Sequence, residues 1–268
     1  MLVFLFVVSG AQARGTWSIS SSVQATQGSY IFDTSTMAVY VYSGLRYRTR
    51  KWNLSASLPM VAQNNDRVTR TGGMFLPTGQ VHHSEGQSGT PHHGGSMTGS
   101  STTTSELKVA MGDLYLYGEL ELFSEWFKRT SVSLGAQMKF PTASPNTNYG
   151  TGEFDYGLGL SVRKRSGSFA GFADIGFLAI GDPDGVTYRD PVTVGGGLGR
   201  VFGKGRFSFL LYYQRYSRIL PGYDPPREVS VGLSVKLNSR STVSLMGLSG
   251  LSETSPDVSV SGGLEWTL

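Results

Sequence analysis

The four histidines of the chain stand in two adjacent pairs, His82-His83 and His92-His93, within the segment VHHSEGQSGTPHHGG. Imidazole nitrogens are ligands for Zn²⁺, Cu²⁺ and Ni²⁺, and Glu85 lies close enough in sequence to add a carboxylate. The segment is glycine-rich and fixes no ligand geometry. Two interpretations therefore stand: a surface loop that captures a metal ion, or a polar loop that contains histidines without a site.

A second group of residues shares one parity on predicted β-strands, on the face opposite to the apolar residues. Its tyrosines can stack on an aromatic solute or simply fill a lumen, and its charged members can select solutes or brace the wall through cross-strand ion pairs. The candidates for a solute pathway are Tyr40, Tyr42, Asp113, Tyr115, Tyr117, Lys139, Glu153, Asp155 and Asp174. Asp113 is the strongest functional candidate. It follows Gly112, where the alternation changes phase and a β-bulge is expected to redirect a side chain.

Nothing in the sequence indicates an enzyme. A serine nucleophile needs a histidine positioned beside it, and every histidine lies in one loop. The string GTGEFDYGLG contains glycines like those of a nucleotide-binding fingerprint, but it lies in a stretch of period two with no helix after it. We expect no cofactor apart from a metal ion at the histidine pairs.

The elements that carry these residues are predicted to be β-strands. In the C-terminal stretch VSVSGGLEWTL, apolar residues alternate with serine, glycine or charge. The same period appears in eleven further stretches: 15–26, 36–48, 51–62, 106–122, 128–140, 152–163, 168–181, 187–201, 205–218, 227–238 and 241–251. Twelve antiparallel strands fit a bacterial single-chain barrel, which requires an even number.

The connections between the predicted strands distinguish a membrane barrel from a soluble sandwich. Short turns are expected at 49–50, 123–127, 164–167, 202–204 and 238–240, and the alternate connections are longer, above all the loop at 63–104. Short periplasmic turns opposite long extracellular loops are typical of outer-membrane barrels. We therefore expect an all-β, antiparallel transmembrane barrel, with residues 14–268 as one domain and the histidine-rich loop outside the cell.

Composition agrees with this class. The chain has 268 residues, 39% of them apolar, with 36 glycines, no cysteine and a net charge of +4. Residues 1–13, MLVFLFVVSGAQA, resemble the end of a secretory signal peptide with an Ala-X-Ala cleavage site. Basic residues are dispersed over separate turns, so no nucleic-acid partner is expected. The expected partners are outer-membrane lipid, a small-molecule solute and the barrel-assembly machinery, around a monomer in the bacterial outer membrane.

Four segments, in order, resemble a known family. They are LSASLPM (54–60), AMGDLYLYG (110–118), GAQMKFPT (135–142) and YGTGEFDYGLGLSVRKR (149–165). The family is the one named for the MetA pathway of phenol degradation, and the match covers roughly residues 50–180. The chain departs from the family pattern at Met60, Met111 and Ala143, and it ends in Leu268 where an aromatic residue is usual for the assembly machinery.

The resemblance implies an outer-membrane channel that passes small hydrophobic or aromatic solutes by passive diffusion. Two alternatives remain open at this point. One is a surface protein that binds or handles metal through the histidine-rich loop. The other is a structural barrel without transport activity.

Overall fold

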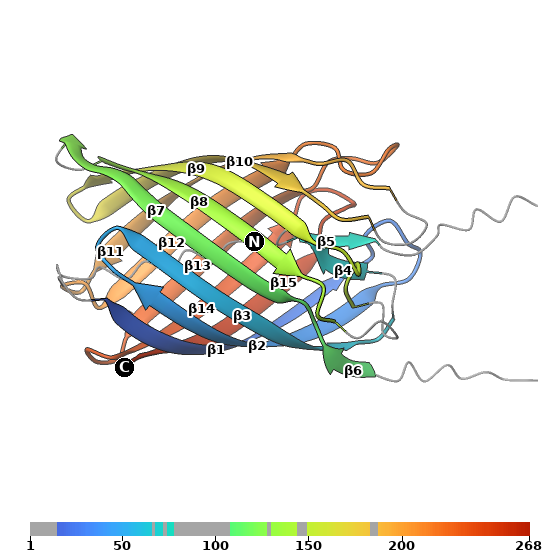
Figure 1. Cartoon of the computed structure of the whole chain (residues 1–268), viewed down its shortest axis with the longest axis horizontal. Helices are drawn as coiled ribbons and strands as arrows, with labels where there is room; N and C mark the ends of the chain where they lie inside the picture. Colours follow the sequence, from blue (N-terminus) through green and yellow to red (C-terminus); the bar gives the residue numbers. More distant parts are fainter. Residues whose placement is uncertain are drawn as a thin grey trace, which may run out of the picture.

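One β-sheet closes on itself to form the wall of the protein, as the computed structural model shows (Figure 1). The structure describes residues 15–65, 68–71, 74–77, 108–127, 130–143, 149–182 and 187–268. Its strands are Thr16–Gly28 (β1), Thr36–Arg48 (β2), Trp52–Gln63 (β3), Val68–Thr71 (β4), Met74–Pro77 (β5), Lys108–Met111 (β6), Leu114–Phe127 (β7), Thr130–Phe140 (β8), Asp155–Ser166 (β9), Phe169–Ala179 (β10), Val192–Phe202 (β11), Phe207–Tyr216 (β12), Arg227–Lys236 (β13), Ser241–Gly250 (β14) and Val258–Thr267 (β15).

The barrel is closed by hydrogen bonding between neighbouring antiparallel strands. β1 pairs with both β2 and β15, and β2 also pairs with β3, so the wall has no free edge. The wall sheet contains 13 hydrogen-bonded segments, of which β6 and β7 lie in succession along β3 as two parts of one strand. The result is a closed antiparallel barrel of 12 strands, which confirms the predicted fold class.

The β-bulge predicted at Gly112 is present. Ser57 of β3 pairs with Tyr115, and Met60 of β3 pairs with Met111. Between these two pairs the strand opposite β3 therefore contains one residue more than β3 does. At the break, the Gly112 amide donates a hydrogen bond of 2.8 Å to the carbonyl of Pro59. The extra residue changes the phase of the alternation, which explains why apolar residues occupy different parities before and after this point.

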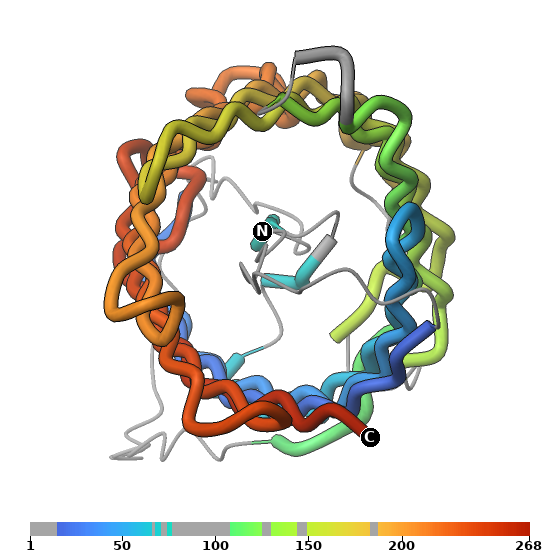
Figure 2. Tube along the Cα trace, turned by 90° about the vertical axis from the view of Figure 1, so that its left-hand side faces the viewer, coloured from blue at the N-terminus to red at the C-terminus, as the bar shows by residue number. Residues whose placement is uncertain are grey.

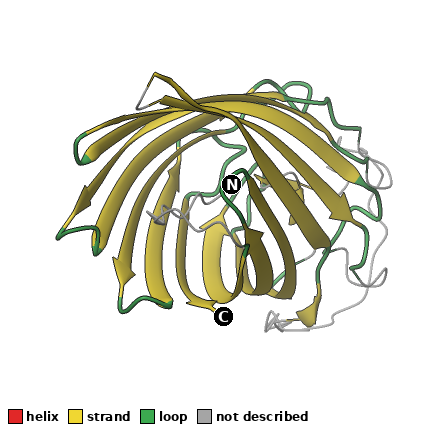
Figure 3. Ribbon diagram, turned by 60° about the vertical axis from the view of Figure 1, so that its left-hand side comes forward, coloured by secondary structure: helices red, strands yellow, loops and turns green. Residues whose placement is uncertain are grey.

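The strand connections are short at one end of the barrel and long at the other (Figure 3). β9 and β10 are joined by two residues, the first of which is Gly167 with a φ of 59°, a backbone angle that glycine adopts without strain. Two expected turns are placed wrongly. Residues 123–127 belong to β7, where a register shift between Glu121 and Phe123 lets the strand continue, and residues 164–166 of the turn expected at 164–167 belong to β9. The predicted asymmetry is otherwise confirmed.

The outer face of the wall is apolar. On β15, Val258 and Val260 are about half exposed, whereas Ser259 between them faces inward and is buried. Exposed aromatic side chains form a ring near the short-turn end: Trp17, Trp52, Phe123, Phe169, Phe202 and Trp266. A second group lies toward the long-loop end: Phe154, Tyr156, Phe177 and Tyr213. An apolar band between aromatic girdles is the surface that a bilayer covers.

In the parts of the chain that the structure describes, no helix has the length and apolar character needed to cross a bilayer.

A short hairpin of β4 and β5 lies inside the barrel (Figure 2). Val68 and Phe75 pack in a buried cluster with Tyr40 of β2. Leu76 belongs to a second cluster with Tyr216 of β12, on another part of the wall. Our expectation that residues 63–104 extend outside as one loop is therefore wrong for the hairpin, whose apolar side chains are buried against inward-facing residues.

Candidate functional site

Arg70 of β4 is held by tyrosines that project inward from the wall. Its guanidinium lies 4.9 Å from the centre of the Tyr42 ring and 5.4 Å from that of Tyr115, and it donates a hydrogen bond to the Tyr42 hydroxyl. The Tyr115 hydroxyl donates to the backbone carbonyl of Arg70 at 2.9 Å. Cation–π contacts of this kind are strongest where water is excluded. We call Arg70, Tyr42 and Tyr115 the arginine cage.

Aromatic packing continues from the cage to the hairpin. Tyr40 stacks on Tyr42 with 5.9 Å between ring centres and lies 5.5 Å from Phe75 of β5. Tyr30, in the loop between β1 and β2, lies 6.5 Å from Phe75. Burial raises the pKa of the Tyr30 hydroxyl, so the Tyr30 side chain stays protonated and uncharged beside Phe75. The rings therefore fasten one side of the hairpin to β2 and its loop.

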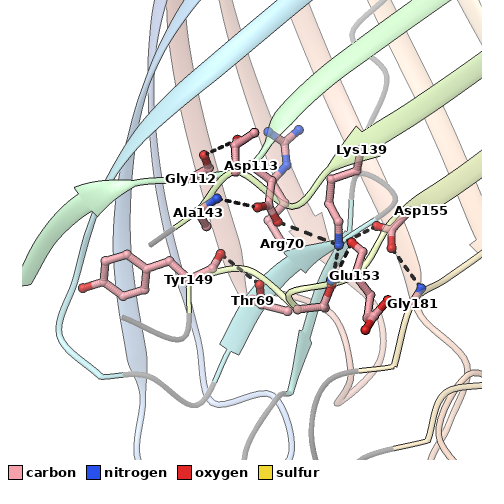
Figure 4. Close-up of polar contacts among 12 residues, drawn as sticks. Thr69, Arg70, Gly112, Asp113, Lys139, Ala143, Tyr149, Glu153, Asp155 and Gly181 are labelled. Carbon is pink, nitrogen blue, oxygen red and sulfur yellow. Dashed lines mark hydrogen bonds and ion pairs between the residues drawn. The ribbon is translucent and has the colours of Figure 1, made fainter. Parts of the chain in front are cut away.

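A buried ionic cluster lies on the neighbouring part of the wall (Figure 4). The Lys139 Nζ is 3.0 Å from an Asp155 oxygen and 3.8 Å from an Asp113 oxygen, and it donates to the Thr151 hydroxyl at 2.6 Å. All four residues are buried. Because two carboxylates share one ammonium, the cluster depends on every partner staying in place. We call Asp113, Lys139 and Asp155 the ionic cluster.

The connection between β8 and β9 ties the ionic cluster to the hairpin. Asp113, redirected by the bulge, accepts a hydrogen bond from the Ala143 amide at 2.9 Å. Further along, the Thr69 hydroxyl of β4 donates to the Tyr149 carbonyl at 3.0 Å, and the Tyr149 hydroxyl donates to the Lys108 carbonyl at 2.6 Å. The hairpin is thus anchored by backbone and side-chain hydrogen bonds as well as by rings.

Glu153 does not join the ionic cluster. It precedes β9, its side chain is exposed, and its backbone amide donates to the Thr151 hydroxyl at 3.3 Å. Our expectation that β9 begins before Glu153 is wrong, because the loop turns back at Gly152, whose φ is 76°. Asp155, by contrast, faces inward and also accepts from the Gly181 amide at 3.0 Å.

A cavity of about 100 Å³ opens in the lumen along β7 to β12. Tyr117 and Asp174, both predicted to face the lumen, line it together with Tyr212 and Tyr216. The Tyr212 hydroxyl donates to an Asp174 oxygen at 2.6 Å. We call this space the tyrosine cavity. Tyr216 also packs in the buried cluster that holds Leu76 of β5, so the cavity borders the hairpin.

Glycines form the floor of the tyrosine cavity. Gly135, Gly159 and Gly176 are register partners in a row across β8, β9 and β10, and all three line it. A Cβ atom at Gly135 would lie 3.2 Å from the Tyr117 hydroxyl. Inward-facing glycines therefore leave bare backbone beneath the rings, which is what keeps the space open.

The sequence indicated only part of this arrangement. It placed Tyr40, Tyr42 and Tyr115 on one face but missed Arg70, because Val68–Thr71 is too short for a period to show. The pair Gly72-Gly73 stands between two four-residue stretches, VTRT (68–71) and MFLP (74–77), and a glycine pair between two short β-prone stretches predicts a hairpin. The inward parity of Tyr212 was also readable from its neighbours on β12.

The histidine pairs, His82-His83 and His92-His93, lie outside the described residues. Within the described residues, no group of three or more histidine or acidic side chains can hold a metal ion. The metal site therefore stays a prediction.

No protein-family model matches the chain, and no curated protein matches its sequence. The resemblance to the family named for the MetA pathway therefore stays a prediction.

Solved structures share its fold. The COG4313 outer membrane channel from Pseudomonas putida F1 superposes with a TM-score of 0.64 at 9% identity, covering 96% of this chain and 97% of that one. The KdgM porin matches with a TM-score of 0.53 at 9% identity, over 94% of this chain and 99% of that one. The NanC porin gives 0.52 at 9% identity, over 94% and 100%. Together with the apolar outer face, this defines the class: the chain is an outer-membrane β-barrel.

Proposed function

We propose that the protein is a passive outer-membrane channel for small hydrophobic or aromatic solutes. The observation that carries the proposal is the tyrosine cavity, an open space inside a closed barrel, lined by Tyr117, Tyr212 and Tyr216 and bordered by an internal hairpin. A barrel that served only as a membrane anchor would need no such space. Tyrosine faces offer apolar contact to a ring, and their hydroxyls keep a hydrogen-bonding partner within reach.

The hairpin of β4 and β5 sets the size limit in this proposal. It lies within the lumen and packs against β2 on one side and β12 on another, so large solutes are held back. Buried polar contacts of the ionic cluster and of the β8–β9 connection hold the wall beside the hairpin. Small solutes would pass between the hairpin and the glycine floor by way of the tyrosine cavity.

The test combines recordings in planar lipid bilayers with uptake of aromatic solutes by cells that lack the protein and cells that carry it. We expect small, discrete conductance steps and slower uptake in the deletion strain. A variant in which residues 68–77 are replaced by a short glycine-serine linker should conduct more. The proposal would be defeated if neither the intact barrel nor the variant without the hairpin conducts and if uptake is the same in both strains.

A further inference from the structure

We propose that the tyrosine cavity is a binding site for a small organic cation, an ammonium ion that carries an aromatic or other apolar group. The inference deepens the proposed channel function. It rests on that function in one respect: the cation must reach the cavity through the lumen. It comes from the charge and the shape of the cavity, taken together.

The charge of the cavity is negative. Of the described residues that line it, Asp174 alone is charged, and the other polar side chains are neutral: Gln137, Ser161, Thr193, Gln214 and the tyrosines. No ion pair within the described residues involves Asp174. Among the residues that the structure describes, the hydrogen bond to Asp174 comes from the Tyr212 hydroxyl, a neutral donor. A carboxylate in a partly dry space without a counter-ion favours a ligand that brings a positive charge.

A basic side chain on the neighbouring strand β9, Arg163, contacts an aromatic ring of β10. Arg163 lies two residues beyond Ser161 on β9, and Ser161 is the register partner of Asp174. The Arg163 guanidinium lies 5.8 Å from the centre of the Phe172 ring, which is the next inward side chain below Asp174 on β10. Arg163 does not line the cavity, and none of the ion pairs among the described residues joins it to Asp174.

The shape of the cavity suits an ammonium ion with an apolar group. Tyr117, Tyr212 and Tyr216 line the space, and tyrosine faces attract organic cations when water is excluded. Tyr212 and Asp174 fit together only because Gly195 faces them, since a Cβ there would lie 2.0 Å from the Tyr212 hydroxyl and 2.6 Å from an Asp174 oxygen. The bare floor of Gly135, Gly159 and Gly176 then leaves room for the apolar part of the ligand.

Three probes of similar size and different charge test the proposal. They are 2-phenylethylammonium, the neutral 2-phenylethanol and the anion 3-phenylpropanoate, each titrated calorimetrically into the full chain in detergent micelles. We expect the cation to bind about tenfold or more tightly than either of the others, because it alone can pair with Asp174. Equal affinity for all three probes, or no binding of the cation, would overturn the proposal.

Two variants locate the site. Asp174→Asn keeps an oxygen for the Tyr212 hydroxyl and removes the charge, so it should weaken binding of the cation about tenfold and leave the neutral probe unchanged. Gly159→Val fills the floor and should abolish binding of the cation. The matched control is Gly232→Val on β13, which faces the lumen away from the cavity and whose Cβ would meet nothing closer than 3.7 Å. Undiminished binding by Asp174→Asn would overturn the assignment.

The channel proposal and this site can fail independently. Conductance with no preference for the cation would leave the channel standing and remove the cation site. Selective binding of the cation to a barrel that does not conduct would do the reverse.

Discussion

Lys139 on β8 and Asp155 on β9 are register partners, and 3.0 Å separates the Lys139 Nζ from an Asp155 oxygen in a pair with almost no exposed surface. Asp113 lies on the other side of the same ammonium, at 3.8 Å, because the bulge turns its side chain inward. One cation thus compensates two buried carboxylates. The ionic cluster should therefore be more sensitive to substitution of Lys139 than to substitution of either aspartate.

Lys139→Met should be among the most destabilising single changes in the wall. It leaves Asp113 and Asp155 buried without a counter-ion, a loss of roughly 3 to 5 kcal/mol in unfolding free energy. Urea-induced unfolding in lipid vesicles measures it. Lys236→Met on β13, where the lysine is partly exposed, is the matched control and should change stability little. A Lys139→Met barrel as stable as the control would mean that the cluster does not hold the wall.

Asp113→Ala and Asp113→Asn should differ, because the carboxylate has two roles. Asparagine keeps an acceptor for the Ala143 amide and removes one of two carboxylates around Lys139, so we expect near-normal stability. Alanine removes the acceptor as well, which costs about 1 to 3 kcal/mol and frees the β8–β9 connection. Limited proteolysis of residues 141–154 reports the difference. Equal cleavage of the two variants would show that the hydrogen bond to Ala143 does not fix this loop.

Arg70→Ala should loosen the hairpin. The substitution removes the contacts with the Tyr42 and Tyr115 rings, a loss of about 2 kcal/mol, which raises the fraction of displaced hairpin roughly thirtyfold while that fraction is small. Single-channel recordings should show more frequent or larger openings. Arg70→Lys should not restore the closed level, because an ammonium lacks the planar face that lies on the rings. Unchanged openings in Arg70→Ala would show that the cage does not hold the hairpin.

The wall was predictable because a strand in a closed barrel has one face toward lipid and one toward the lumen, so apolar and polar residues alternate along its sequence. The phase change at Gly112 even located the bulge, since one extra residue exchanges the faces of everything after it. The end of β7 was not predictable, because the register shift after Glu121 lets an aromatic stretch that looks like a turn continue as strand.

The lumen was predictable only as a set of inward side chains. Parity placed Tyr42, Tyr115 and Asp174 on the right face, but parity does not state which partner each one meets. Arg70 reaches Tyr42 from a four-residue strand in a long connection, and no local pattern fixes where such a connection folds. The row of Gly135, Gly159 and Gly176 likewise depends on the register of three strands, which emerges only when the barrel closes.

Leu160→Arg tests directly which face of the wall meets lipid. Leu160 lies in the middle of β9 on the outer face, 41% exposed, with Leu134 and Ile175 as its register partners. A charge at this depth should cost about 2 to 4 kcal/mol in vesicles, because arginine near the bilayer midplane loses its hydration. Leu237→Arg, also on an exposed leucine but beside a short turn, should cost about 1 kcal/mol or less, since its charge reaches the headgroups. Equal costs at the two positions would contradict a bilayer centred on the barrel wall, because the two exposed leucines would then lie at very different depths in the membrane.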